Sequence, residues 1–133
     1  MADLLVGCDV GTGGTKAVVM AVDGEVLGAH YIEYPLITKK GPGENFPGAK
    51  AEHDPEWYWN AVADTIQVSI HNAKANPKDI KGVSISALSP ACILVDQHLQ
   101  PLQNAHIWMD RRATAECDWI RQHIGEERVF NLS

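Results

Sequence analysis

The chain has 133 residues, of which 45% are hydrophobic, and its 17 acidic against 11 basic residues give a formal net charge of −6. Its apolar stretches fall short of the ~20 residues that a membrane-spanning helix needs. Basic residues cluster no further than Lys39-Lys40, which argues against nucleic acid as a partner because binding to a phosphate backbone needs concentrated Lys and Arg. The sequence therefore predicts a globular α/β chain with one core that has neither membrane nor nucleic acid among its partners.

Cysteine and histidine usage indicates no stabilising framework. The three cysteines, Cys8, Cys92 and Cys117, lie far apart, so they suggest neither a disulfide framework nor a zinc site. The six histidines show no metal-ligand spacing either. This usage fits a reducing cytoplasm.

The first predicted element is a glycine-rich turn between two strands. The apolar runs Leu4–Cys8 and Ala17–Val22 flank the segment from Asp9 to Lys16, and a third run, Glu25–Tyr34, follows the turn Asp23-Gly24. β-branched apolar runs around residues that permit positive φ are typical of a β-hairpin. A dinucleotide fingerprint would need glycine where Lys16 stands, and a P-loop would need glycine before Lys16 and Ser or Thr after it. We therefore predict strand, turn, strand, turn, strand.

This hairpin carries the residue types that bind phosphate. Its candidate residues supply close backbone N–H groups or side-chain donors: Gly11, Thr12, Gly13, Gly14, Thr15 and Lys16. Asp9, at the end of the first strand, is a candidate ligand for Mg²⁺, directly or through its waters. Nucleotide chemistry is thus the leading hypothesis. The alternative is that the turn only connects two strands, because short motifs produce false matches.

A helix is predicted in the middle of the chain. Pro35–Gly48 is rich in Pro and Gly and predicts a surface loop. Asp54 and Pro55 then predict the N-cap and first turn of a helix from about Pro55 to Ala75 that covers one face of a sheet. Its apolar residues recur at helical spacing: Trp59, Val62, Ala63, Ile66, Ile70 and Ala73. Trp57, Tyr58 and Trp59 are expected to pack in the core.

The C-terminal half predicts three short strands and a helix. Lys81–Ala87 and Ala91–Asp96 are separated by Leu88-Ser89-Pro90, and a polar turn with Pro101 leads to the extended stretch Ala105–Met109. Asp110 is expected to cap a helix that ends at Gly125. The apolar face of this helix would consist of Ala113, Cys117, Ile120 and Ile124. The order of elements favours a mixed sheet with helices over a doubly wound fold.

These motifs, in this order, resemble the amino-terminal part of the FGGY carbohydrate kinases, the group of xylulokinase, glycerol kinase, gluconate kinase and ribulokinase. The resemblance covers essentially the whole chain. It rests on Asp9-x-Gly-Thr-x-x-x-Lys16, Glu52-His53-Asp54-Pro55 with Trp59, Gly82-Val-Ser-Ile-Ser-Ala, and Ile107-Trp108-Met109-Asp110-Arg111-Arg112. The hairpin is shared by the actin, Hsp70 and hexokinase superfamily, whereas the later motifs are specific to the sugar kinases.

The resemblance implies a fold and a domain organisation. The fold would be α/β, a mixed sheet flanked by helices in an incomplete ribonuclease H-like domain. Residues 1–133 would be the amino-terminal part of the first of two domains, with the rest of both domains absent. We therefore expect a fragment that is inactive alone and lacks the downstream aspartate that serves the family as general base. An incomplete domain exposes apolar sheet surface, so self-association is expected, with a homodimer as the candidate assembly.

The resemblance also implies a reaction. A cytoplasmic, xylulokinase-like kinase would transfer the γ-phosphate of Mg·ATP to a hydroxyl of a ketose, polyol or sugar acid. Asp9 would help place Mg²⁺ and the phosphoryl group, and the hairpin would hold phosphate oxygens. The residues implied for the sugar side are Ser89, Pro90, Trp108, Asp110 and Arg112. Ser89-Pro90 stands where xylulokinases resemble Met-His and glycerol kinases Arg-Glu, and this departure leaves the sugar open.

Each assignment has a plainer alternative. Asp110 could be only an N-cap, Trp108 core packing, Arg112 a solvated side chain in a first helical turn, and Ser89-Pro90 a connection. Two other functions compete with the kinase: an ATPase like actin or Hsp70, and a sugar-binding regulatory module that has lost catalysis. The motifs from Trp108 to Arg112 and from Glu52 to Pro55 argue against the ATPase.

Overall fold

The main sheet has four strands and mixed pairing. The computed structural model describes residues 3–39 and 49–132. In it the strands are ordered β3-β2-β1-β6, with β1 antiparallel to β2, β2 antiparallel to β3, and β1 parallel to β6. Their bounds are β1 Leu4–Val10, β2 Gly14–Ala21, β3 Val26–Glu33 and β6 Ile80–Ala87. All four lie where the sequence predicts strands, and the mixed sheet is confirmed.

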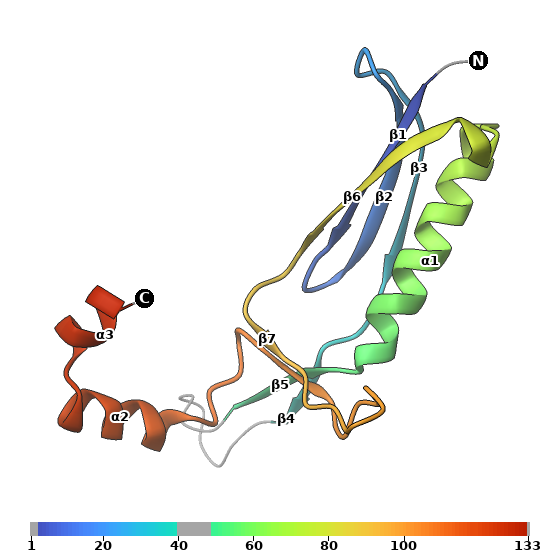
Figure 1. Ribbon diagram of the computed structural model, residues 1–133. Coiled ribbons are helices and arrows are strands. Elements are labelled where there is room, and N and C mark those ends of the chain that lie inside the picture. Colours follow the sequence, from blue (N-terminus) through green and yellow to red (C-terminus); the bar gives the residue numbers. More distant parts are fainter. Residues whose placement is uncertain (1–2, 40–48, 133) are drawn as a thin grey trace.

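One helix, α1 (Pro55–Asn72), runs along one face of this sheet (Figure 1). It begins as predicted, because the side chain of Asp54 accepts a hydrogen bond from the backbone N–H of Glu56 at 3.0 Å and Pro55 occupies the first turn. It ends at Asn72 rather than Ala75, and the short 3₁₀ turn Pro77–Asp79 leads into β6. The strands β1 and β6 can run parallel because the chain between them includes this helical crossover.

The core lies between this helix and the sheet. Alternate residues of β1 face α1, as the period of a strand requires, and the buried ones are Leu4, Val6, Cys8 and Val10. From α1 the buried residues are small: Ala61, Thr65 and Ser69. The predicted Val62, Ile66 and Ile70 pack against the buried residues of β1 and β2 and are only partly buried. Trp59 was expected in the core, and this prediction is wrong because the residue is 70% exposed.

The small residues on α1 reflect a close approach to the sheet. The Ser69 hydroxyl donates to the carbonyl oxygen of Ala17 on β2 at 3.0 Å. A Cβ added to Gly28 on β3 would lie 2.5 Å from the backbone N of Ala73 and from the backbone O of Ser69. Large side chains at these positions would hold the helix away from the sheet. Hydrophobic periodicity detects large apolar residues, so it predicted their neighbours on α1 as the core and missed the small residues at the contact.

A second, smaller sheet corrects the prediction of a loop over Pro35–Gly48. Its order is β4-β5-β8-β7, with all pairs antiparallel. The bounds are β4 Ile37–Lys39, β5 Lys50–His53, β7 Ala91–Cys92 and β8 Ala105–Ile107. Ile37–Lys39 is therefore a strand, whereas residues 40–48 of the expected loop lie outside the described residues. The predicted strand Ala91–Asp96 is reduced to Ala91–Cys92 and a single bridge between Val95 and Pro101.

The polar turn after residue 95 is confirmed, and Asp96 organises it. One carboxylate oxygen of Asp96 accepts hydrogen bonds from the backbone N–H of His98 at 2.8 Å and of Gln100 at 2.9 Å. This is the local bonding by which Asp side chains stabilise turns.

Two short helices end the described chain, α2 (Thr114–His123) and α3 (Glu126–Leu132). The prediction that Asp110 caps α2 is wrong: the cap residue is Ala113, which makes no side-chain cap bond. Gly125, with φ +87°, ends α2 as predicted.

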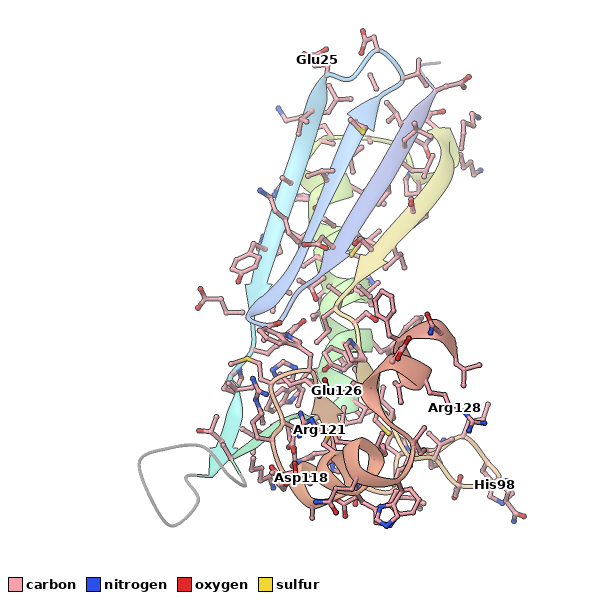
Figure 2. All side chains as sticks on the ribbon, turned by 90° about the vertical axis from the view of Figure 1, so that its left-hand side faces the viewer. Glu25, His98, Asp118, Arg121, Glu126 and Arg128 are labelled. Atoms are coloured by element: carbon pink, nitrogen blue, oxygen red, sulfur yellow. The ribbon has the colours of Figure 1, made fainter. Side chains whose placement is uncertain are left out.

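An exposed ion pair joins α2 to α3, and neither helix contains a buried residue. In Figure 2 Arg121 lies near Asp118 and Glu126, and its guanidinium donates to their carboxylates at 2.8 and 3.1 Å. The predicted apolar face is thus exposed, with Ile120 at 38% and Ile124 at 40%. Across residues 3–39 and 49–132, no helix combines the length and the apolar character needed to cross a membrane.

Candidate functional site

The glycine-rich turn is the predicted hairpin. The backbone N–H of Gly11 donates to the carbonyl oxygen of Gly14 at 2.8 Å, and the antiparallel register places Asp9 opposite Lys16. The expected use of positive φ is wrong, because the glycines with positive φ among the described residues are Gly24 and Gly125. At Gly14 the missing side chain provides space instead: an added Cβ would clash with the carbonyl oxygen of Ile32 and lie 2.6 Å from the Tyr31 hydroxyl.

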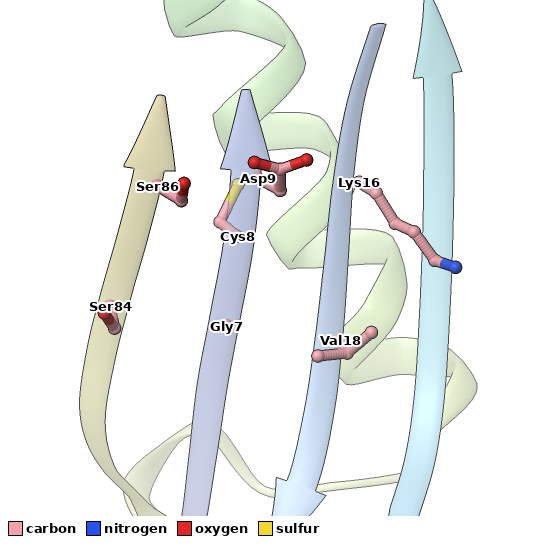
Figure 3. Close-up of a pocket in the computed structure, with 7 residues that line it drawn as sticks. All are labelled: Gly7, Cys8, Asp9, Lys16, Val18, Ser84 and Ser86. Carbon is pink, nitrogen blue, oxygen red and sulfur yellow. The ribbon is translucent and has the colours of Figure 1, made fainter. Parts of the chain in front are cut away.

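The sheet face opposite α1 carries an open hollow of about 300 Å³. Asp9, Lys16, Ser84 and Ser86 line it together with Gly7. Figure 3 shows Asp9 on the central strand with Ser86 on one side and Lys16 on the other. The register explains this arrangement, since Asp9 is the Cα partner of Lys16 on β2 and of Ser86 on β6. A carboxylate, an ammonium group and two hydroxyls are therefore presented to solvent on one surface.

The donor set decides which kind of metal this surface suits. Among residues 3–39 and 49–132, no group of three or more His, Cys, Asp or Glu side chains could hold an ion by itself. Mg²⁺ keeps several waters and is commonly bound by one or two carboxylates together with substrate phosphates. The exposed carboxylate of Asp9 beside the turn fits that mode and does not fit a resident all-protein metal site.

Thr15 lies on the other side of the sheet from Asp9 and Lys16. Its side chain is fully buried, and its hydroxyl donates to Tyr34 Oη at 3.4 Å. The structure thus places this hydroxyl in the core, away from the open hollow, although the sequence had offered it as a phosphate donor. Only the backbone of Thr15 remains part of the predicted phosphate hairpin.

Trp108 joins the predicted sugar side to the hairpin. Its indole Nε1–H donates to the hydroxyl oxygen of Thr12 at 3.1 Å. The side chain is 54% exposed, so it is not packed in the core formed by the described residues. Ser89 and Pro90 are also exposed, and the backbone N–H of Leu88 just before them donates to the carbonyl oxygen of Val10 at 2.8 Å. Both predicted acceptor segments are thereby attached to the strands that carry the hairpin.

Asp110 and Arg112 are paired with each other and with Glu52. Arg112 Nη2 lies 2.7 Å from Asp110 Oδ2 and 2.6 Å from Glu52 Oε1. The Asp110 and Glu52 side chains are 9% and 5% exposed, against 38% for Arg112. Arg112 precedes α2, so it is not a solvated residue of a first helical turn. The backbone N–H of Ala51 also donates to Asp110 at 3.0 Å, which ties the segment after β8 to β5.

This ion cluster keeps both acids charged. Burial alone would raise the pKa of Asp110, but hydrogen bonds from Arg112 and from the backbone N–H of Ala51 outweigh it and hold the pKa well below its ordinary value. Burial acts on Glu52 in the same way, and there Lys50, Asn104 and Arg112 together lower the pKa. Glu52 belongs to the Glu-His-Asp-Pro motif, which is the sequence signal that could have identified it.

An aromatic cluster supports the hairpin from the core side. Tyr34 is in edge contact with His53, at 5.3 Å between ring centroids, and with Tyr58 at 5.9 Å, and it stacks on Trp57 at 6.4 Å. The packing predicted for Trp57 and Tyr58 is thus confirmed. Burial raises the pKa of Tyr58 to about 12 and lowers that of His53, whose Nδ1 lies 2.9 Å from the Tyr58 hydroxyl. The sequence offers no indication that Tyr34 belongs to this cluster, since it stands out only as the last residue of a predicted strand, before Pro35.

Comparisons with known proteins agree on one family. The model of the N-terminal domain of the FGGY family of carbohydrate kinases matches residues 4–133. A xylulose kinase from Haemophilus influenzae is 29% identical over 127 residues, covering 92% of this chain and 24% of the relative. A glycerol kinase from Rhizobium meliloti is 28% identical over 132 residues, covering 98% and 25%.

Solved structures share the fold. The crystal structure of gluconate kinase from Lactobacillus acidophilus matches with a TM-score of 0.82 and 24% identity, over 98% of this chain and 25% of that chain. This chain spans about a quarter of the length of the curated relatives it matches. Because the family model matches nearly every residue, the chain belongs to the FGGY family of carbohydrate kinases, in the region of their N-terminal domain.

Proposed function

We propose that the whole protein is an ATP-dependent, cytoplasmic sugar kinase, and that residues 1–133 are the amino-terminal part of its first domain. It transfers the γ-phosphate of Mg·ATP to a hydroxyl of a ketose, polyol or sugar acid. The observation that carries this proposal is the hydrogen bond between Trp108 and Thr12. Through it, the segment that the family resemblance assigns to the sugar meets the turn assigned to phosphate.

On the phosphate side, this chain supplies donors and charge. Phosphoryl transfer depends mainly on positioning and on stabilising the charge of the transferring group. The glycine-rich turn offers backbone N–H groups, and Lys16, on the strand β2 that follows the turn, adds an ammonium group. Because the Thr12 hydroxyl oxygen accepts the Trp108 N–H, its own proton is left to donate to a phosphate oxygen.

Asp9 is the residue that would hold Mg²⁺, directly or through its waters. The bound ion would neutralise phosphate charge. Lys16 and Ser86 lie on the two strands beside Asp9 and on the same open face, and Figure 3 shows the Lys16 side chain extending away from Asp9.

On the acceptor side, the exposed groups are Ser89, Pro90 and the indole of Trp108. An aromatic face covers the apolar side of a sugar ring, and a hydroxyl can bond one of its oxygens. Asp110 and Arg112 hold this segment against β5, and the exposed part of the guanidinium remains open to a sugar hydroxyl. The relatives named above act, by their names, on xylulose, glycerol and gluconate, so the acceptor class stays broad.

The experiment is ADP release by the full-length protein with Mg·ATP across pentuloses, hexuloses, polyols and sugar acids. One strongly stimulating acceptor would establish the kinase and identify its substrate. Release that is independent of every acceptor would instead indicate an ATPase. Bound nucleotide without release would indicate a regulatory module.

A substitution of Asp9 tests the assignment of the catalytic surface. Asp9→Asn should lower kcat by about 10²-fold or more, the loss typical when a group that stabilises transition-state charge is removed. The melting temperature should change little, because Asp9 is exposed. Asp3→Asn is the matched control, an acid whose side chain is 62% exposed and which lies just before β1, at the other end of that strand from Asp9. Turnover at the wild-type level in Asp9→Asn would remove this residue from the mechanism.

A further inference from the structure

Two tyrosine hydroxyls hold carbonyl groups of the glycine-rich turn. Tyr34, which directly follows β3, donates from Oη to the carbonyl oxygen of Gly11 at 2.6 Å. Tyr31, within β3, donates to the carbonyl oxygen of Gly13 at 3.2 Å. The resemblance to known kinases assigned neither residue a role.

These bonds fix the direction of peptide N–H groups. In a trans peptide the carbonyl and the following N–H point in opposite directions. Holding the Gly11 carbonyl toward Tyr34 therefore turns the N–H of Thr12 the other way. A phosphate oxygen is attracted by an N–H and repelled by a carbonyl oxygen, so the orientation of this one peptide decides whether the turn offers a donor or an acceptor.

Tyr34 is the better anchored of the two tyrosines. It is 8% exposed, whereas Tyr31 is 48% exposed. His53, Trp57 and Tyr58 surround its ring, and Thr15 donates to its hydroxyl oxygen at 3.4 Å. Burial raises the pKa of Tyr34 above its usual value, so the hydroxyl keeps the proton that it donates to Gly11.

We propose that Tyr34 is a positioning residue for nucleotide binding: its hydroxyl holds the Gly11–Thr12 peptide so that the Thr12 N–H faces the phosphates of Mg·ATP. The inference rests on the proposed function. It also explains what the Glu52–Pro55 motif contributes to the phosphate side, since His53 forms one wall of the cluster that holds the Tyr34 ring.

The test compares Tyr34→Phe with Tyr58→Phe in the full-length protein. Each change removes one hydroxyl from the same cluster, but only Tyr34 bonds the turn. Tyr34→Phe should weaken binding of Mg·ATP, measured by calorimetry, by about 2- to 12-fold, the factor that corresponds to one net hydrogen bond. The KM for the sugar should stay within about twofold of wild type. Tyr58→Phe should leave the affinity for Mg·ATP unchanged.

Two results would overturn the inference. Either Tyr34→Phe binds Mg·ATP as tightly as wild type, or Tyr58→Phe loses as much affinity as Tyr34→Phe. If Tyr34→Phe does not fold, Thr15→Val provides the second variant, because it removes the other hydrogen bond of the Tyr34 hydroxyl and should weaken nucleotide binding in the same direction. Wild-type protein that binds no Mg·ATP would refute the proposed function as well, whereas wild-type binding with unaffected variants refutes the inference alone.

Discussion

At Gly28 the C-terminal end of α1 lies close against the main sheet, so Gly28→Ala is a sharp test of the packing. The added Cβ would lie 2.5 Å from the Ala73 N, 2.5 Å from the Ser69 O and 2.9 Å from the Ala73 Cα. All three are backbone atoms, so no side chain can rotate out of the way. Since non-bonded carbon atoms prefer separations of about 3.5 Å or more, the end of the helix must move by about 1 Å.

The cost of this movement follows from the contacts that it disturbs. Overpacking a well-filled core costs about 1–3 kcal/mol, and backbone neighbours place this site at the upper end. A displaced helix also weakens the bond from the Ser69 hydroxyl to Ala17, which contributes about 1 kcal/mol. Alanine is favoured over glycine in a strand by about 0.5–1 kcal/mol, which offsets part of the loss. We expect the free energy of unfolding to fall by about 2–3 kcal/mol.

Urea unfolding of the purified protein measures this change. Gly82→Ala is the matched control in β6, where the added Cβ would lie 3.4 Å from Leu5 Cδ2, an ordinary contact with a flexible side chain. The control should stay within about 0.5 kcal/mol of wild type, as substitutions away from special features usually do. The reasoning is refuted if Gly28→Ala is as stable as wild type, or if the control loses as much.

The remaining predictions concern pH and the acceptor. The folded-state pKa values of Glu52 and Asp110 lie below their ordinary values of 4.5 and 3.8, so their stabilisation is full above about pH 4.5 and is lost as the pH falls below it. Glu52→Gln should reduce the slope of unfolding free energy against pH between about pH 3 and 5, and an unchanged slope would contradict the ion cluster. Trp108→Leu should raise the KM for sugar far more than that for ATP, and Ser89→Ala should do so less strongly. Equal effects on both substrates in steady-state kinetics would instead indicate a packing role.

The main sheet and α1 could be predicted because their signals are local and repeat. Residues 4–10 alternate between buried and exposed positions, and Asp54-Pro55 marks the start of a helix. The second sheet could not, because its strands have two to four residues, too few for alternation to be recognised. Their partners are also distant in sequence, as in the pairing of Glu52 with His106.

Asp110 illustrates why a correct residue can receive the wrong structural role. Its carboxylate accepts a hydrogen bond from the backbone N–H of Arg112, the same short-range bonding that an N-cap uses. Asp110 thus makes the kind of local bond for which Asp is favoured at a helix start. Its structural role, however, is set by the ion pairs of the Arg112 side chain with Asp110 and Glu52. Glu52 lies 60 positions before Arg112, so no local pattern could indicate that pair.

In the candidate site, the pairing of Asp9 with Lys16 follows from the hairpin alone. Tyr34 could not be inferred, since its role depends on a hydroxyl that reaches back 23 positions to the Gly11 carbonyl. Trp108 was identified only through the family resemblance, and its bond to Thr12 depends on the fold.

The separation between the partners of the candidate site has a consequence for how the chain folds. Trp108 and Thr12 are 96 positions apart, and Asp9 meets Ser86 only once β6 has joined β1. Contacts between neighbouring segments form faster than those that close long loops. The hairpins of β1, β2 and β3 can therefore assemble early, whereas the acceptor side must wait for α1 and β6. A nascent chain on the ribosome would thus display the turn proposed to bind phosphate before the segments proposed to bind the sugar are in place.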